Sequence, residues 1–113
     1  MQAYEMKWID LVVVNLHPIG ELIATPALTT DEVVEQIDIG GTAMLRSAAK
    51  NFRYVTAVVN PERYPTIMHE MRAHDGAVSY LTRYRLAQEA FAATAKYDRD
   101  LADYLRQMQP PEA

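Results

Sequence analysis

Two short runs rich in β-branched residues, each followed by a proline, stand out in the hydrophobic pattern. Residues 9–16 read IDLVVVNL and residues 54–60 read YVTAVVN. Neither run alternates between apolar and polar positions, which is typical of strands that are covered on both faces. Because the segment between them has a helical pattern, the two runs form a βαβ unit, and the sequence predicts an α/β fold with a parallel sheet.

The segment between the two runs is predicted to hold two helices. Thr29 and Glu32 have the spacing of a capping box, which opens a helix after a loop over residues 18–29. The sequence Asp38-Ile39-Gly40-Gly41 then interrupts the helical pattern. A second helix is expected over residues 42–51. Its buried side is predicted to be Met44, Leu45, Ala48 and Ala49.

The chain after the second run is predicted to be mainly helical. One helix covers residues 62–72, and a longer one covers residues 79–108 without an internal glycine or proline. At 1.5 Å per residue the longer helix would be roughly 40 Å long, so we expect a bend or break near Tyr97 and Asp98. Its apolar stripe is predicted to be Tyr84, Ala87, Phe91, Ala95, Leu101 and Leu105.

Composition narrows the class of protein. The chain has 113 residues, a formal charge of -4 and no cysteine. Without cysteine there are no disulfides, thiolate zinc sites or cysteine nucleophiles, and the mild acidity disfavours a nucleic-acid binder. No apolar run approaches the roughly 20 residues that span a bilayer, and no signal-peptide pattern is seen, so we expect a cytoplasmic protein.

Polar residues follow the first run, where ligands collect in open α/β sheets. Asn15 offers both a donor and an acceptor, and His17 can donate, accept or titrate near neutral pH. The simpler interpretation is that Asn15 closes a turn and His17 is solvated. The histidines, which also include His69 and His74, lack the spacing of metal ligands on a shared helix face, so no metal site is expected.

The Asp38-Ile39-Gly40-Gly41 segment can serve an anion or a polarised carbonyl oxygen, because glycines at a helix start let a ligand approach backbone N–H groups. Alternatively, the glycines only break the helix and Asp38 caps it. Lys50 can supply a cation for a developing oxyanion or complement the dipole at a helix C-terminus, and its position alone favours the dipole.

Four segments taken together resemble one family in their order and spacing. They read IDLVVVNLHP, VEQIDIGGTAMLRSAAKN, VTAVVNPERY and TRYRLAQEAFAATAKYD. The chain is similar to the inosine monophosphate (IMP) cyclohydrolase domain of the PurH family of bifunctional purine-biosynthesis proteins. The resemblance implies a methylglyoxal-synthase-like, Rossmann-like α/β fold. It also implies closure of the six-membered ring of formamido-imidazole-carboxamide ribotide to IMP, with loss of water and without metal or cofactor.

The resemblance further implies roles for individual residues. Asp38 and Lys50 match the family's catalytic aspartate and lysine. His17 stands where the family usually has tyrosine, so we expect it to act as the donor there with a different reach and titration range. A second departure is GGTA, where GGPT or a near variant is usual. The positions that match the family's purine contacts are Asn15, Ile39, Gly40 and Gly41.

The resemblance covers only the C-terminal part of the family's domain. Because the family's N-terminal strands and phosphate-binding segment have no counterpart, we expect residues 1–113 to be a single partial domain, inactive or incomplete alone. A two-stranded parallel sheet is unstable alone, so we predict pairing with a second copy or with a separately encoded N-terminal half. The rival interpretation is a noncatalytic α/β remnant that serves as an assembly or nucleotide-binding module.

Overall fold

The computed structural model describes residues 9–24 and 28–112, and it confirms an α/β fold with a parallel sheet. Strand β1 (Leu11–Val13) pairs with β2 (Thr56–Val58), with Leu11 opposite Thr56. The helices that connect the strands are α1 (Ile19–Ile23), α2 (Thr30–Glu35) and α3 (Gly40–Lys50). The helices that follow β2 are η2 (Pro61–Arg63), α4 (Tyr64–Ala73) and α5 (Tyr80–Gln107).

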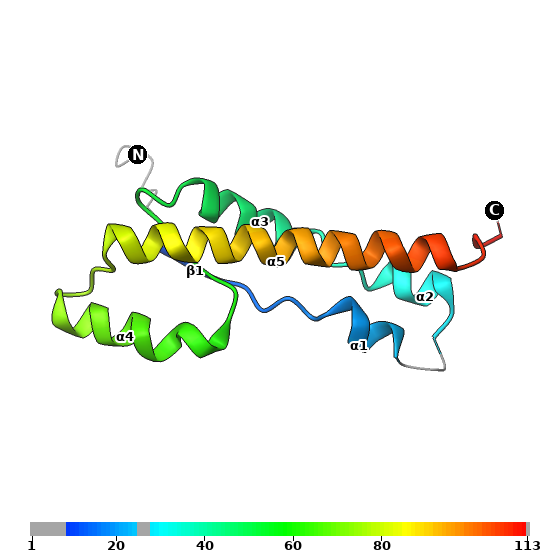
Figure 1. The fold of residues 1–113 in the computed structure, drawn as a ribbon, viewed down its shortest axis with the longest axis horizontal. Helices are drawn as coiled ribbons and strands as arrows, with labels where there is room; N and C mark the ends of the chain where they lie inside the picture. Colours follow the sequence, from blue (N-terminus) through cyan, green and yellow to red (C-terminus); the bar gives the residue numbers. More distant parts are fainter. Residues whose placement is uncertain (1–8, 25–27, 113) are drawn as a thin grey trace, which may run out of the picture.

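Helix α5 runs along the long axis of the molecule, and the other elements lie along its sides (Figure 1). Its first half packs on α3 and β2, and α1 also packs against it. The predicted bend or break near Tyr97 and Asp98 is wrong, because the helix continues through both residues. With 28 residues it is about 42 Å long, and packing along its length stabilises it as one continuous helix.

The main core lies between α3, α5 and the sheet. Leu45 and Ala49 of α3 and Ala90 of α5 are fully buried there, and the small alanines let the two helices approach closely. Leu45, Ala48 and Ala49 were expected in this core and are confirmed. Met44 is 56% exposed, so its predicted burial is wrong. It lies about 100° around the helix from Leu45 and therefore faces solvent.

The buried stripe of α5 differs in part from the predicted one. Ala87 is buried as expected and Leu101 is half-buried. Tyr84, Phe91, Ala95 and Leu105 are all exposed. The actual stripe follows a spacing of three and four residues that faces α3, the sheet and α1. Its members are Leu86, Ala87, Ala90, Thr94, Tyr97 and Tyr104.

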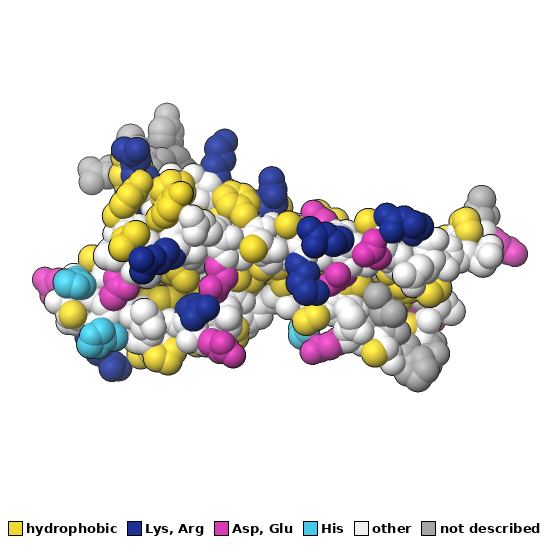
Figure 2. Space-filling model, viewed as in Figure 1, with side chains coloured by type: hydrophobic (Ala, Val, Ile, Leu, Met, Phe, Trp, Pro, Cys, Tyr) yellow, Lys and Arg dark blue, Asp and Glu magenta, His cyan; other side chains and the backbone are white. Residues whose placement is uncertain are grey.

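The opposite side of α5 is a solvated, charged face, on which Figure 2 shows basic and acidic side chains interspersed. Lys96 pairs with Asp100 at 2.5 Å, and Arg106 pairs with Asp103 at 2.8 Å. Exposed helix pairs of this kind each contribute only about 0.3 to 0.5 kcal/mol. The charges therefore keep this face exposed to solvent. The buried stripe fixes the position of the helix.

The two strands differ in how well they are covered. All three residues of β2 are buried, as predicted. The same prediction is wrong for β1, where Leu11 is 43% and Val13 is 46% exposed. Their register partners Thr56 and Val58 are covered on that face, and Val58 packs with Ile67 of α4. Among the described residues this cover ends at β2, so one face of β1 stays open.

The helix boundaries are close to those expected, with two differences: an additional helix, α1, and an earlier start of α3. The capping box is confirmed, because the Thr29 hydroxyl accepts from the N–H of Glu32 at 3.2 Å while the Glu32 carboxylate accepts from the N–H of Thr29. Helix α1 lies inside the predicted loop over residues 18–29, of which residues 25–27 lie outside the described part of the chain. Helix α3 begins at Gly40 rather than at residue 42, so both glycines belong to its first turn.

The carboxylate of Glu70, in α4, is hydrogen-bonded to the start of α5. Glu70 accepts from the N–H of Ser79 at 2.9 Å and from the hydroxyl of Thr82. These hydrogen bonds, that of Thr82 above all, hold the pKa of the Glu70 carboxyl below its ordinary value. The carboxylate therefore stabilises the start of α5 only while it is ionised.

Glu70→Gln is expected to lower the melting temperature slightly at pH 7, by the equivalent of less than about 1 kcal/mol because the group is only half-buried and solvent screens it. Since the folded-state pKa is depressed, the contribution is present above the ordinary value of 4.5 and is lost as pH falls through the folded value. Thermal melts of both proteins from pH 7 to pH 3 should therefore converge. Glu112→Gln, at the exposed C-terminal end, is the control and should show no such difference.

Candidate functional site

A cleft of about 510 Å³ lies where α1, the segment before α3 and the middle of α5 meet. It brings together His17 and Asp38, two of the residues predicted for the site. His17 is exposed at the end of the segment after β1, and Asp38 is half-buried. The residues that line the cleft are His17, Pro18, Ile19, Glu21, Leu22, Gln36, Asp38 and Tyr97.

Asp38 is held by three hydrogen bonds. Its Oδ1 accepts from the N–H of Gly41 at 2.7 Å, and its own N–H donates to the hydroxyl oxygen of Tyr97 at 2.8 Å. The hydroxyl of Thr42 donates to its carbonyl oxygen at 3.1 Å. Asp38 thus caps the N-terminus of α3, where the helix dipole favours a negative charge. Its Oδ2 has no hydrogen bond donor among the described residues.

The two glycines of this segment are not equivalent. A Cβ on Gly41 would lie 2.4 Å from Oδ2 and 2.8 Å from Oδ1 of Asp38, whereas a Cβ on Gly40 would meet nothing within 4 Å. Only at Gly41 does the carboxylate need the space that glycine leaves. Because the Gly41 N–H already binds Asp38, it is not free for a ligand, and the neighbouring Ile39 is exposed.

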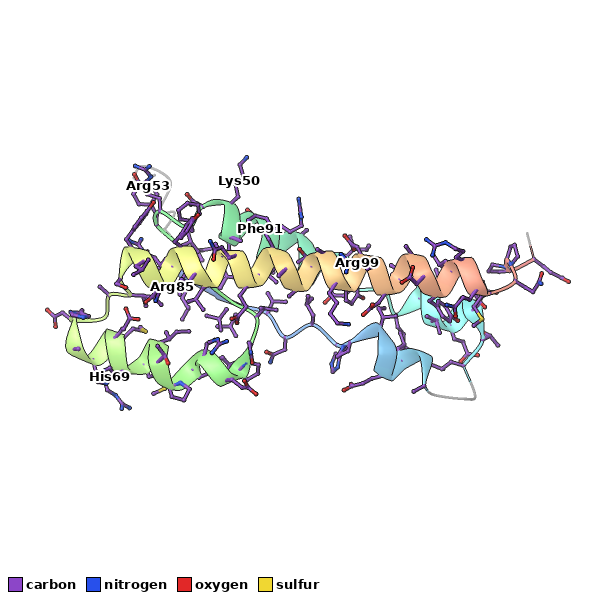
Figure 3. All side chains as sticks on the ribbon, viewed as in Figure 1. Lys50, Arg53, His69, Arg85, Phe91 and Arg99 are labelled. Atoms are coloured by element: carbon purple, nitrogen blue, oxygen red, sulfur yellow. The ribbon has the colours of Figure 1, made fainter. Side chains whose placement is uncertain are left out.

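Lys50 and Asn15 lie outside the cleft. Lys50 is the last residue of α3 and is exposed, and Figure 3 shows its side chain pointing away from α5. Ten residue steps along a helix separate it from Gly40 by about 15 Å. Asn15 is exposed and is not among the lining residues. The structure therefore brings His17 and Asp38 together, and it leaves Lys50 at the far end of α3, where it complements the helix dipole.

Tyr97 is the residue of the cleft that sequence reasoning missed. It was expected only as a packing or interface residue, like the other tyrosines of this helix, and it is indeed only 5% exposed. Its contact with Asp38 joins residues 59 positions apart, which no local pattern reveals. The one available signal was its polar hydroxyl, because a buried tyrosine hydroxyl usually has a hydrogen-bond partner.

Residues 9–24 and 28–112 hold neither a cluster of metal-ligating side chains nor a membrane-spanning helix. In that part of the chain, no group of three or more acidic or histidine side chains could hold a metal ion. None of the helices there is both long enough and apolar enough to cross a bilayer.

The cleft can perform acid–base chemistry. A carboxylate that is fixed by its neighbours can orient an amide or accept its proton, and an imidazole can donate a hydrogen bond to an oxygen that becomes negative. The surrounding hydrogen bonds hold the Asp38 backbone and side chain in one geometry, which is what positioning of a reactive group requires.

Comparison with known proteins agrees with the resemblance seen in the sequence. The family model described as AICARFT/IMPCHase bienzyme matches residues 48–113, which is more than half of the chain. The bifunctional purine biosynthesis protein PurH of Desulfitobacterium hafniense is 56% identical over 97 residues, and that of Chlorobium phaeobacteroides is 48% identical over 106 residues. These matches cover 86% and 94% of this chain but only 18% and 20% of the relatives.

A solved structure has a similar fold. The crystal structure of ForH superposes with a TM-score of 0.76 at 34% sequence identity, covering 90% of this chain and 53% of that chain. The chain thus spans about half of this structural neighbour and about a fifth of the curated relatives that it matches.

Proposed function

Because the chain belongs to the AICARFT/IMPCHase bienzyme family, we propose that it performs the IMP cyclohydrolase step of purine biosynthesis. The reaction closes formamido-imidazole-carboxamide ribotide to IMP and releases water. The observation that carries the proposal is the Asp38 carboxylate, held at the start of α3 in a cleft that also contains His17. We assign the activity to the cytoplasm, and to a complex that supplies the rest of the domain.

The chemistry matches these two side chains. The carboxamide nitrogen attacks the formyl carbon, so a C–N bond forms while the nitrogen loses a proton and the formyl oxygen gains negative charge. Asp38 orients the amide or accepts that proton, and His17 donates to the oxygen. The oxygen takes up two protons in all and leaves as water when its C–O bond breaks. The former formamide nitrogen gives up the second proton, and a C=N double bond forms in the new ring. Because the two arms belong to one molecule, holding them close supplies much of the acceleration.

The remaining assigned residues have supporting roles. Asn15, Ile39, Gly40 and Gly41 are proposed to border the purine, with Gly41 acting through the space that it leaves for Asp38. Lys50 is proposed to stabilise the ligand oxygen as a cation. Since it lies about 15 Å along α3 from Gly40, it would serve the cleft of a neighbouring copy in an oligomer.

The partner that we propose is the preceding part of the family's domain, and its docking site is the edge of β1 with which no other described strand pairs. The N–H of Val14 donates to Val58, and the N–H of Thr56 donates to Asp10, both at 2.9 Å. Successive residues of a strand direct their backbone groups to opposite sides, so Leu11 and Val13 direct theirs away from β2. The exposed side chains of the same two residues give the edge an apolar surface for a third strand.

Val13→Pro is expected to weaken binding of this partner by about ten- to a hundredfold, because it removes an N–H that only a third strand would use. The ladder between β1 and β2 does not need that donor, so the circular dichroism of the chain should stay the same. The partner is the segment of the Desulfitobacterium hafniense relative that precedes the matching region, and titration calorimetry measures its affinity. Val13→Thr keeps the N–H and a β-branched side chain and should bind normally. Equal affinity of both variants would contradict docking at this edge.

Ring closure tests the function itself. The chain is mixed with the same partner segment and with formamido-imidazole-carboxamide ribotide, and IMP formation is followed by absorbance. We expect turnover with the partner and little or none without it. Binding of the ribotide without turnover, even with the partner, would instead indicate a noncatalytic nucleotide-binding module.

A further inference from the structure

Tyr97 connects the long helix to the loop that carries Asp38. It is buried in the middle of α5, and its hydroxyl oxygen accepts the backbone N–H of Asp38 at 2.8 Å. It also lines the cleft together with Asp38 and His17. Among the residues that line this cleft, Tyr97 is the one with a hydroxyl group.

The contacts of Asp38 show what this hydrogen bond adds. The carbonyl oxygen of Asp38 is bound by Thr42, and its Oδ1 by Gly41, and both of these residues belong to α3. The Tyr97 hydroxyl is the one hydrogen bond to Asp38 that comes from outside this segment of the chain among the described residues. The core packing of α3 on α5 positions the two helices, and this hydrogen bond additionally ties the loop that carries Asp38 to α5.

We propose that Tyr97 is a positioning residue that acts through Asp38. By binding the Asp38 N–H it fixes the loop, so that Oδ2, which no described residue binds, faces the ligand in a constant orientation. This inference rests on the proposed function. It adds that the rate of ring closure depends on a hydroxyl group of α5 that need not touch the reacting atoms.

Tyr97→Phe removes only this hydroxyl, and Tyr104→Phe is the matched control. Tyr104 is also buried on α5, but its hydroxyl makes no hydrogen bond with the described residues. In the isolated chain, hydrogen exchange by NMR should show the Asp38 amide exchanging about tenfold faster in Tyr97→Phe and unchanged in Tyr104→Phe. An unchanged Asp38 amide in Tyr97→Phe would overturn the inference.

A double-mutant cycle separates positioning from simple stabilisation. With the partner segment present, Tyr97→Phe should lower kcat about tenfold and change KM less. In the Asp38→Asn background the same substitution should change kcat by less than about twofold, because the group through which it acts is gone. A tenfold loss that persists in that background, or an equal loss in Tyr104→Phe, would show that Tyr97 acts on the fold alone.

Failure of the proposed function is distinguishable from failure of this inference. If Asp38→Asn is as active as the wild type, the assignment of Asp38 fails, whatever Tyr97 does. If Asp38→Asn is impaired and Tyr97→Phe is not, only the inference fails. The same cycle is also measured on the affinity for IMP, so that a complex without turnover still shows whether Tyr97 and Asp38 are coupled.

Discussion

Asp38→Asn is expected to lower the rate of ring closure by about a hundredfold or more in the complemented protein, because a positioned general base contributes about 10² to 10⁴ in rate. The substitution is close to isosteric. The side-chain carbonyl of asparagine can still accept the N–H of Gly41, which is bound at 2.7 Å, so the cap of α3 is retained. What disappears is the negative charge and the ability to take a proton.

The measurement is the initial rate of IMP formation at saturating ribotide, with the melting temperature taken in parallel. Asp31→Asn is the matched control, because Asp31 is an exposed aspartate in the first turn of another helix, α2. It should leave the rate unchanged. Full activity of Asp38→Asn at a normal melting temperature would remove Asp38 from the mechanism.

Gly41→Ala is expected to lower the rate nearly as much as Asp38→Asn, although it changes no polar group. The new methyl carbon would lie 2.4 Å from Oδ2 and 2.9 Å from Cγ of Asp38, so the carboxylate must rotate away. It then loses both its hydrogen bond to Gly41 and its orientation toward the cleft. Alanine is favoured over glycine in helices by about 1 kcal/mol, which offsets part of the lost cap.

Gly40→Ala provides the control at the neighbouring position. A methyl group there meets nothing within 4 Å, so Asp38 keeps its orientation, and we expect a slightly raised melting temperature. Because Gly40 is proposed to border the purine, we expect some loss in the rate of ring closure, but a much smaller one than in Gly41→Ala. Rates and thermal melts of the two variants should therefore diverge, with Gly41→Ala losing activity at a nearly normal melting temperature. Equal activity of the two variants would show that the carboxylate does not need its observed orientation.

Local signals predicted the parts of the fold that depend on neighbouring residues. The capping box of Thr29 and Glu32, the two strands and the buried side of α3 apart from Met44 all follow from short spacings. The cover of β1 could not be predicted in this way. A run of β-branched residues shows that a strand forms, but what lies on each face depends on elements elsewhere in the chain or in a partner.

For the candidate site, too, the local segments could be predicted from the sequence, whereas their arrangement in space could not. The segment around Asp38 was identified from its glycines and from the family resemblance. His17 was identified from its position after the first strand and from the same resemblance. The shared cleft and the hydrogen bond to Tyr97 depend on the packing of α5, which begins 42 residues after Asp38. The distance of Lys50 from the cleft follows from the earlier start and the straight course of α3.

The unbroken course of α5 makes the molecule sensitive to changes in chain length at one particular place. Ala90 is anchored in the core beside the sheet, and Tyr97 meets Asp38 two turns later on the same rod. One extra residue between them would rotate everything beyond by about 100° and advance it by about 1.5 Å, which turns the tyrosine away from the loop. Point substitutions on the outer face of this stretch leave the spacing intact, whereas a single inserted or deleted residue would uncouple the cleft from the sheet.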